Sequence, residues 1–133
     1  MISTTAMRST LLALAFVLFV FVGNTNAEEQ DGSYFLRACG AAVKETDGTK
    51  LSEEESVLAF YCISYVAGFL DAMSVTVSTT NGTKIVCTPE RGIVNDQAVR
   101  IFVKYLRENP EKLHQSGRIS LYIALAKAFP CKK

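Results

Sequence analysis

Four cysteines are the residues of this sequence best suited to covalent chemistry. They are Cys39, Cys62, Cys87 and Cys131. A zinc site would require cysteines or histidines in closely spaced pairs, such as CxxC or HxxxH, and neither pattern occurs here. An even number of widely spaced cysteines in a small chain is typical of disulfides formed in an oxidising compartment. The sequence therefore predicts two disulfides and no metal.

The other groups that could take part in catalysis are His114, the single histidine, and Asp71 in an apolar stretch. A nucleophilic serine or cysteine needs a base such as histidine beside it, whereas His114 stands in the polar turn LHQS, where a surface or capping role is expected. A buried, unpaired carboxylate would destabilise the fold or shift its pKa. We therefore expect Asp71 to accept a hydrogen bond from a backbone amide or from Tyr65 or Tyr122, and we predict no catalytic residue.

The composition argues against several further classes of function. The chain has 14 Lys and Arg against 13 Asp and Glu, with a formal net charge of +1, and the two signs are interspersed, which does not favour nucleic-acid binding. The motifs HExxH and GxSxG and a glycine-rich phosphate loop do not occur. We predict that the protein is not an enzyme and takes no cofactor.

The N-terminal residues resemble an export signal. Arg8 precedes the apolar run Leu11–Val22, which at about a dozen residues is shorter than the roughly 20 that a membrane-spanning helix needs. Small residues follow at Thr25 and Ala27, and acidic residues come next. We predict cleavage after Ala27, which leaves 28–133 as a single domain without a membrane segment, and an uncleaved anchor is the alternative.

The elements that position the cysteines are all predicted to be helices. Helical spacing and capping signals occur in the segments 31–44, 52–80, 95–109 and 117–129. Asp31 or Ser33 caps the first, Ser52 and Glu55 form a capping box at the start of the second, and Asn95 caps the third. With no strand predicted, the fold class is all-α, a compact, bundle-like domain of four to five helices stapled by two disulfides.

The second segment is predicted to be the central helix. It is apolar on nearly every face between residues 57 and 70, which is typical of a helix surrounded by neighbours. Gly68 suggests that another helix packs closely against it, because glycine is unfavourable within a helix. A membrane span is disfavoured by the acidic residues Glu53–Glu55 before the run, by Ser64 within it and by Asp71 at its end.

The last two helices are each expected to bury one apolar stripe. The residues in these stripes are Val94, Ala98, Ile101, Phe102, Tyr105 and Leu106, then Ile119, Tyr122, Ile123, Leu125, Ala126 and Phe129. Both stripes have the three- and four-residue spacing of one helix face. We expect them to meet the central helix in a single core.

The pairing of the cysteines follows from the predicted helices. Cys39 and Cys62 lie almost symmetrically about the turn near residue 50, so they should face each other across two neighbouring helices. Cys87 would then bond Cys131 and close the last two helices into a ring. Four cysteines allow three connectivities, and the other two stay open.

An ordered set of residues runs through nearly the whole predicted domain. Its members are Tyr61, Cys62, Tyr65, Val66, Gly68, Asp71, Cys87, Pro89, Gln97, Lys104, Tyr105, Leu106, Pro110, Phe129, Pro130 and Cys131. This pattern resembles the Rap/Tai immunity family, small helical proteins of the bacterial periplasm. They protect a cell against peptidoglycan amidase effectors that neighbours deliver by type VI secretion. The resemblance implies a periplasmic protein, a homodimer, that binds such an effector.

In such a protein a rigid loop would lie across the cleft of the amidase and exclude its substrate. The segment 80–95 is the candidate here, because it is long, polar and tethered at Cys87. Its predicted contact residues are Lys84, Glu90 and Arg91, although an ordinary solvated loop is the alternative. We expect structural roles for the motif residues Tyr61, Tyr65, Gly68, Asp71, Phe129 and Pro130.

Two other functions compete with immunity. A small periplasmic chaperone, or a general protein-binding module without a cognate toxin, would also be a disulfide-stapled helical domain of low net charge. A secreted enzyme is disfavoured because no pair of nucleophile and base and no set of metal ligands is apparent. An NlpC/P60-like amidase encoded beside the gene would favour immunity over the chaperone.

Overall fold

The computed structural model describes residues 30–80 and 86–131. Along them the elements are α2 (Gly32–Thr46), α3 (Glu53–Thr80), α4 (Asn95–Glu108), the short 3₁₀ helix η1 (Pro110–Lys112) and α5 (Gly117–Ala128). These residues form no strand and only two isolated β-bridges, so the predicted all-α class is confirmed. Lys84 and the predicted cleavage point after Ala27 lie outside the described residues.

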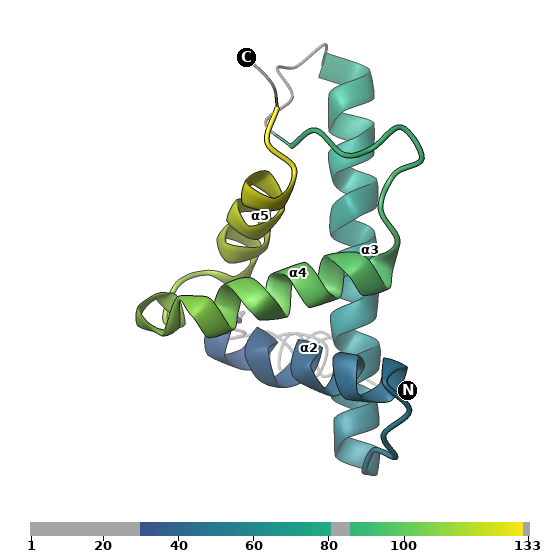
Figure 1. The fold of residues 1–133 in the computed structure, drawn as a ribbon, viewed down its shortest axis with the longest axis vertical. Helices are drawn as coiled ribbons and strands as arrows, with labels where there is room; N and C mark the ends of the chain where they lie inside the picture. The colour runs from purple at the N-terminus through teal and green to yellow at the C-terminus, as the bar shows by residue number, and fades with distance from the viewer. Residues whose placement is uncertain (1–29, 81–85, 132–133) are drawn as a thin grey trace, which may run out of the picture.

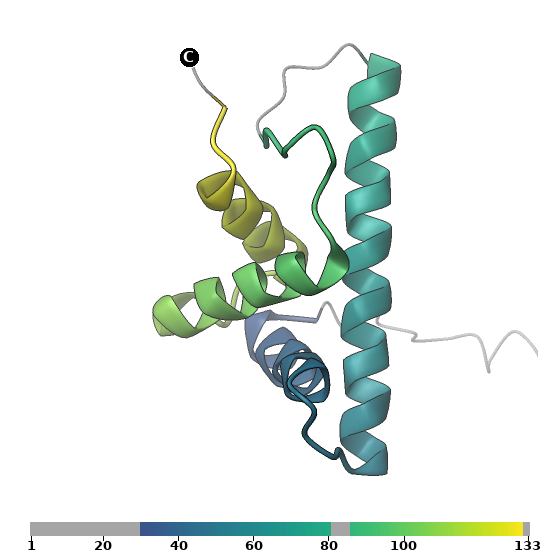
Figure 2. The ribbon, with the colours of Figure 1, turned by 45° about the vertical axis from the view of Figure 1, so that its right-hand side comes forward.

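The long helix α3 is the axis on which the other helices are arranged. Figure 1 shows α3 upright, with α2 and α4 lying across it, and Figure 2 shows that both of them approach it from the same side. α2 packs against α3 and α4, and α5 packs mainly against α4. The core therefore lies on one side of α3.

Local signals set the ends of α2. The Asp31 side chain accepts a hydrogen bond from the Tyr34 amide at 2.9 Å, so Asp31 rather than Ser33 is the N-cap. At the other end Gly48 has a φ of 82°, a left-handed conformation that glycine adopts without steric penalty. Its amide donates to the Glu45 carbonyl at 2.9 Å, which turns the chain toward α3.

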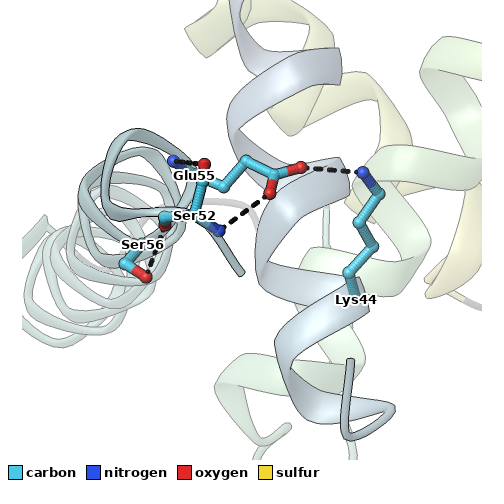
Figure 3. A network of polar contacts seen from close by, with 4 residues as sticks. All are labelled: Lys44, Ser52, Glu55 and Ser56. Carbon is cyan, nitrogen blue, oxygen red and sulfur yellow. Dashed lines mark hydrogen bonds and ion pairs between the residues drawn. The ribbon is translucent and has the colours of Figure 1, made fainter. Parts of the chain in front are cut away.

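The predicted capping box at the start of α3 is confirmed (Figure 3). The Glu55 amide donates to Ser52 Oγ at 3.2 Å, and the Ser52 amide donates to Glu55 Oε2 at 3.1 Å. Glu55 Oε1 also accepts from Lys44 Nζ of α2 at 2.9 Å. The hydrogen bond from Lys44, followed by that from the Ser52 amide, lowers the pKa of Glu55. The cap thus joins α3 to the end of α2.

The start of α4 differs from the prediction by one residue. Val94, not Asn95, is the N-cap, because the Val94 carbonyl accepts the first helical hydrogen bond, from the Ala98 amide at 3.1 Å. Asn109 ends the helix, and its Nδ2 donates to the Tyr105 carbonyl at 2.8 Å. The chain then turns through η1, which begins at Pro110, as the proline signal predicts.

Both predicted disulfides are present. Cys39 and Cys62 join α2 to α3, with 5.1 Å between their Cα atoms. Cys87 and Cys131 join the segment before α4 to the end of the chain after α5, with 5.0 Å between their Cα atoms. The connectivity predicted from the helix order is therefore confirmed, and the other two connectivities are excluded.

The core gathers around the Phe35 ring of α2. Its centroid lies 4.5 Å from that of Tyr65 and 5.6 Å from that of Phe102. The fully buried large side chains are Phe35, Phe102, Leu106, Leu121, Leu125, Val66 and Val99. The predicted stripe of α4 is confirmed at Ala98, Phe102, Tyr105 and Leu106, but Val94 is 69% exposed, so its predicted burial is wrong. In α5 the predicted stripe is wrong except at Leu125, because the buried face of that helix consists of Gly117, Ser120, Leu121, Ala124 and Leu125, and Ile119 is 51% exposed.

The prediction that α3 is surrounded by neighbours is also wrong. Ala59, Cys62 and Val66 on one side of the helix are fully buried, whereas Val57 and Phe60 are 65% and 73% exposed. α3 is long and apolar enough to cross a membrane by length and composition, with only 17% of that stretch buried. The physical reason is geometric, because α2 and α4 both pack on the same side of α3.

Candidate functional site

The segment between α3 and α4 is described from Val86 onward, and its first residues are fixed to the end of the chain. Val86 forms an antiparallel bridge with Pro130, and the Cys87 amide donates to the Phe129 carbonyl at 2.9 Å. The disulfide from Cys87 to Cys131 joins the same two segments of the chain. One end of the candidate loop is therefore anchored by a covalent bond and by backbone pairing.

The middle of this segment is a tight, exposed turn. The Gly92 amide donates to the Pro89 carbonyl at 2.8 Å, and Gly92 has a φ of 73°, which disfavours any residue with a Cβ. Residues 88–92 are all exposed, whereas Ile93 packs against the core. α4 begins directly afterwards, at Asn95. The turn is thus presented to solvent between two fixed ends.

Two of the three predicted contact residues lie at the tip of this turn. Glu90 and Arg91 are its two central residues, and both are exposed. Lys84 lies outside the described residues. The sequence reasoning did not identify Gly92 as the residue that closes the turn, although the order Pro-Glu-Arg-Gly is a recognisable turn signal.

The predicted motif residues divide between the core and the surface. Tyr61 and Tyr65 belong to an aromatic cluster with Tyr34 and Phe35, in which the Tyr61 and Tyr65 rings stack at 6.2 Å. Burial raises the pKa of Tyr34. The Tyr61 hydroxyl donates to Gln30 Oε1. These aromatic residues pack α2 against α3.

The C-terminal motif residues support the candidate loop. The Phe129 amide caps α5 by donating to the Leu125 carbonyl at 2.9 Å, and the Phe129 carbonyl accepts from Cys87, as described above. Pro130 is exposed and pairs with Val86. The FPC motif therefore fixes the root of the loop.

Gly68 and Asp71 have surroundings that differ from the prediction. Both lie on the exposed side of α3, and a Cβ added to Gly68 would meet no described atom within 4 Å. The predicted close helix contact at Gly68 is therefore wrong within this chain, and Asp71 is not buried. Close packing occurs instead at Gly117 of α5, where an added Cβ would lie 2.1 Å from the Phe35 ring.

The described surface holds few groups suited to catalysis. His114 is exposed, as expected, and no three His, Cys, Asp or Glu side chains in the described ranges are grouped as metal ligands. A shallow hollow of about 330 Å³ is lined by Val43, Arg100, Val103, Lys104, Arg107 and Glu108. Arg100 there is paired with Asp47 at 2.7 Å and with Asp96 at 3.0 Å, and these hydrogen bonds raise its pKa.

One family model matches most of the chain. The model of the Rap1a immunity proteins matches residues 31–131, which include both disulfides, the loop between α3 and α4 and the FPC motif. This chain belongs to the Rap1a immunity protein family. No curated protein and no solved structure matches it. Membership of the Rap1a family supports an immunity function, and such a function implies binding to a cognate effector.

Proposed function

We propose that this Rap1a family protein is a periplasmic immunity protein that binds a type VI secretion peptidoglycan amidase and occludes its active site. The observation that carries the proposal is the exposed turn Pro89–Gly92, whose root is held by the Cys87–Cys131 disulfide and by the Val86–Pro130 bridge. A loop that is ordered before binding loses little conformational entropy when it enters a cleft. Such a loop can therefore bind the amidase with high affinity and keep the substrate out of its cleft.

The predicted compartment is consistent with the covalent structure. The apolar run Leu11–Val22 and the small residues before Glu28 favour export with cleavage after Ala27. Disulfides persist in the bacterial periplasm and are rare in the cytosol. An immunity protein of this kind would meet incoming amidases where peptidoglycan is accessible, and we propose that it does so as a homodimer.

Glu90 and Arg91 are the proposed contact residues within the described loop. Their opposite charges stand side by side at the tip of the turn, so each can pair with a group of the opposite sign on the effector. Lys84 is proposed as a third contact on the basis of the sequence alone. Charged contacts at an interface set the specificity and the association rate, which suits a protein that must recognise one toxin.

The test begins with a search of the neighbouring genes for an NlpC/P60-like amidase, and then measures whether this protein inhibits it. The protein is purified from the periplasm, and release of peptide from peptidoglycan is measured with increasing inhibitor. We expect full inhibition at a one-to-one ratio, and at least a tenfold loss with Arg91→Glu, since breaking a buried, hydrogen-bonded charge pair at an interface costs about 2–5 kcal/mol. Lys50→Glu, at the opposite end of α3, is the charge-matched control and should inhibit normally.

The possible results separate the function from the site. If the unaltered protein neither binds nor inhibits the amidase, the immunity function is wrong, and broad suppression of client aggregation would then favour the chaperone. If it inhibits fully and Arg91→Glu and Glu90→Lys inhibit equally well, the function stands but the loop is not the contact surface.

A further inference from the structure

The two disulfides of the chain differ in how easily a second molecule can reach them. Cys39 and Cys62 are fully buried between α2 and α3. Cys87 and Cys131 are partly exposed, and the segment 88–92 that follows Cys87 is exposed throughout. A disulfide is reduced when a thiolate approaches one of its sulfur atoms, so the rate of reduction depends on access. The Cys87–Cys131 disulfide is therefore the one that is open to thiol–disulfide exchange in the folded protein.

The Cys87–Cys131 disulfide also lies away from the packing that holds the helices together. In Figures 1 and 2 the segment before α4 and the segment after α5 lie on the far side of α4 from α2. The core around Phe35 joins α2, α3 and α4, and Cys39 and Cys62 belong to it. Opening the Cys87–Cys131 disulfide would leave this core and the other disulfide intact.

The backbone contacts that join the same two segments are short. They are the Val86–Pro130 bridge and the hydrogen bond of 2.9 Å from the Cys87 amide to the Phe129 carbonyl. Pro130 is exposed. Even a complete two-stranded hairpin is only marginally stable in water, so a pairing of this length depends on the covalent bond beside it. Without the disulfide, the segment after α5 would separate from Cys87.

We infer that the Cys87–Cys131 disulfide is a site of reversible thiol–disulfide exchange with a protein dithiol of the CxxC class. Its reduction releases the root of the loop that contains the turn Pro89–Gly92, while the four helices stay folded. A dithiol suits this site better than a single thiol does. Its second thiol is held beside the mixed disulfide at a high effective concentration and completes the reduction.

The exchange is a two-electron transfer in two steps. A thiolate of the reductant attacks one sulfur of the pair and forms a mixed disulfide, and the other sulfur leaves as a thiolate that takes up a proton. The second thiol of the reductant then loses its proton and attacks the mixed disulfide, which releases the remaining cysteine. Cys87 and Cys131 become thiols, and the reductant becomes a disulfide. The protons that the reductant loses balance those that the cysteines gain.

The consequence for inhibition rests on the proposed function. In the oxidised protein the turn Pro89–Gly92 is held at its root before it meets a partner. A loop released by reduction loses more conformational entropy when it binds, which weakens the complex. The oxidised protein is therefore the stronger inhibitor, and the reduced protein is the weaker one.

The first test measures which disulfide a reductant opens in the folded protein. Oxidised protein purified from the periplasm is incubated with dithiothreitol, quenched with acid, alkylated with N-ethylmaleimide and mapped by peptide mass spectrometry. We expect Cys87 and Cys131 to be alkylated at least tenfold faster than Cys39 and Cys62. In urea, where the fold is lost, all four should be alkylated. Equal rates in the folded protein, or faster reduction of Cys39–Cys62, overturn the proposal.

The second test examines the class of partner. The probe is a thioredoxin whose second active-site cysteine is replaced by serine, so that a mixed disulfide accumulates. It should form an adduct at Cys87 or Cys131, which peptide mapping identifies. The double variant Cys87→Ala with Cys131→Ala keeps only the buried disulfide, and with unchanged helical circular dichroism it should form no adduct. An adduct with this folded variant, or none with the unaltered protein, contradicts the proposal.

The third test determines what reduction does to the structure. Hydrogen exchange is compared between the oxidised protein and the protein kept in dithiothreitol. The Cys87 amide should exchange at least tenfold faster after reduction, because its acceptor on Phe129 moves away. The amides of Phe102 and Leu121, in the buried parts of α4 and α5, should not change. Unchanged protection at Cys87, or faster exchange at all of these amides, overturns the local release that we propose.

Inhibition of the amidase separates this inference from the proposed function. Dithiothreitol is removed without access to air before the amidase is added. Reduction should weaken inhibition at least tenfold, and reoxidation should restore it. If the oxidised protein does not inhibit the amidase, the proposed function is wrong, and alkylation and hydrogen exchange alone decide the exchange site. If reduction frees the Cys87 amide and inhibition is unchanged, the exchange site stands and the loop is not the contact surface.

Discussion

The two sides of α3 are made from the same kind of residue but have different surroundings. Cys62 and Val66 on the inner side are fully buried against α2 and α4, whereas Phe60 and Val75 on the outer side are mostly exposed. All four are apolar residues of one helix. The difference shows that apolar composition alone does not tell a buried face of a helix from an exposed one, because burial depends on where the neighbouring helices lie.

The largest expected difference between the two sides comes from a buried charge. Val66→Asp should reduce the free energy of unfolding by about 4 kcal/mol or more, because the carboxylate would be placed among fully buried apolar groups. Val75→Asp, at a 60% exposed position, should cost less than about 1 kcal/mol. Urea denaturation measures both, and failure of Val66→Asp to accumulate as folded protein is the same outcome. Equal effects would remove the distinction between the sides.

The disulfide on the inner side should contribute strongly to stability. A disulfide lowers the conformational entropy of the unfolded chain. For a separation of 23 residues this stabilises the folded state by about 3 kcal/mol, and for a separation of 44 by about 4 kcal/mol. Replacing Cys39 and Cys62 by alanine also leaves space among fully buried residues, so a loss above 3 kcal/mol is expected.

The second disulfide provides the matched comparison. Cys87 and Cys131 are only half-buried, so their replacement by alanine should lose no more than the 4 kcal/mol of chain entropy. It should also weaken amidase inhibition, since it releases the root of the proposed contact loop. If the variant that lacks the Cys39–Cys62 disulfide is more stable than the variant that lacks Cys87–Cys131, burial around the Cys39–Cys62 disulfide does not add to the stability of the protein.

Two glycines test the same distinction with a single methyl group. Gly117→Ala should lose roughly 1–3 kcal/mol, because its Cβ would lie 2.1 Å from the buried Phe35 ring. Gly68→Ala should gain roughly 0.5–1 kcal/mol in the monomer, since it improves helix propensity without a clash. Thermal unfolding at low protein concentration compares them. A loss with Gly68→Ala under those conditions would show that this site is covered within one chain.

The smallest expected effect concerns the exposed cap of α3. The hydrogen bond from Lys44, with that from the Ser52 amide, lowers the pKa of Glu55 in the folded protein below its ordinary value of 4.5. The stabilisation that the Glu55 carboxylate contributes is therefore fully present above about pH 4.5, and it is lost as the pH falls through the pKa of the folded state. Glu55→Gln should lower the melting temperature slightly at pH 7 and leave it unchanged near pH 2. The neighbouring variant Glu54→Gln is the control, and a Glu55→Gln effect that persists at pH 2 would contradict this account.

Local signals in the sequence predicted most of the fold. The capping box of Ser52 and Glu55, the cap of the first helix at Asp31 or Ser33 and the stop before Pro110 each depend on residues within one helical turn. The all-α class and both disulfides followed from helical spacing and from the order of the helices. Such features are predictable because the groups that interact are close in sequence or constrained by few alternatives.

The sequence predicted where the candidate loop lies, but it did not predict the backbone pairing that anchors the loop. Its length, polarity and the cysteine at its start indicated a tethered segment, and Glu90 and Arg91 are indeed exposed in it. The pairing of Val86 with Pro130 joins residues far apart in the sequence. No local pattern specifies that pairing, so the anchoring of the loop root became visible only in three dimensions.

What the sequence by itself determined is the helical class, most of the helix ends and the resemblance that the family match confirmed, and it favoured the cysteine pairing that the structure then selected. What only the tertiary structure decided is which sides of those helices are covered. Gly68 and Gly117 are the clearest case, since the first was expected to pack closely and is exposed, while the second packs on Phe35. A sequence records which surfaces can be buried, but burial is a property of the pair of surfaces that meet, and α2 and α4 both meet the same side of α3.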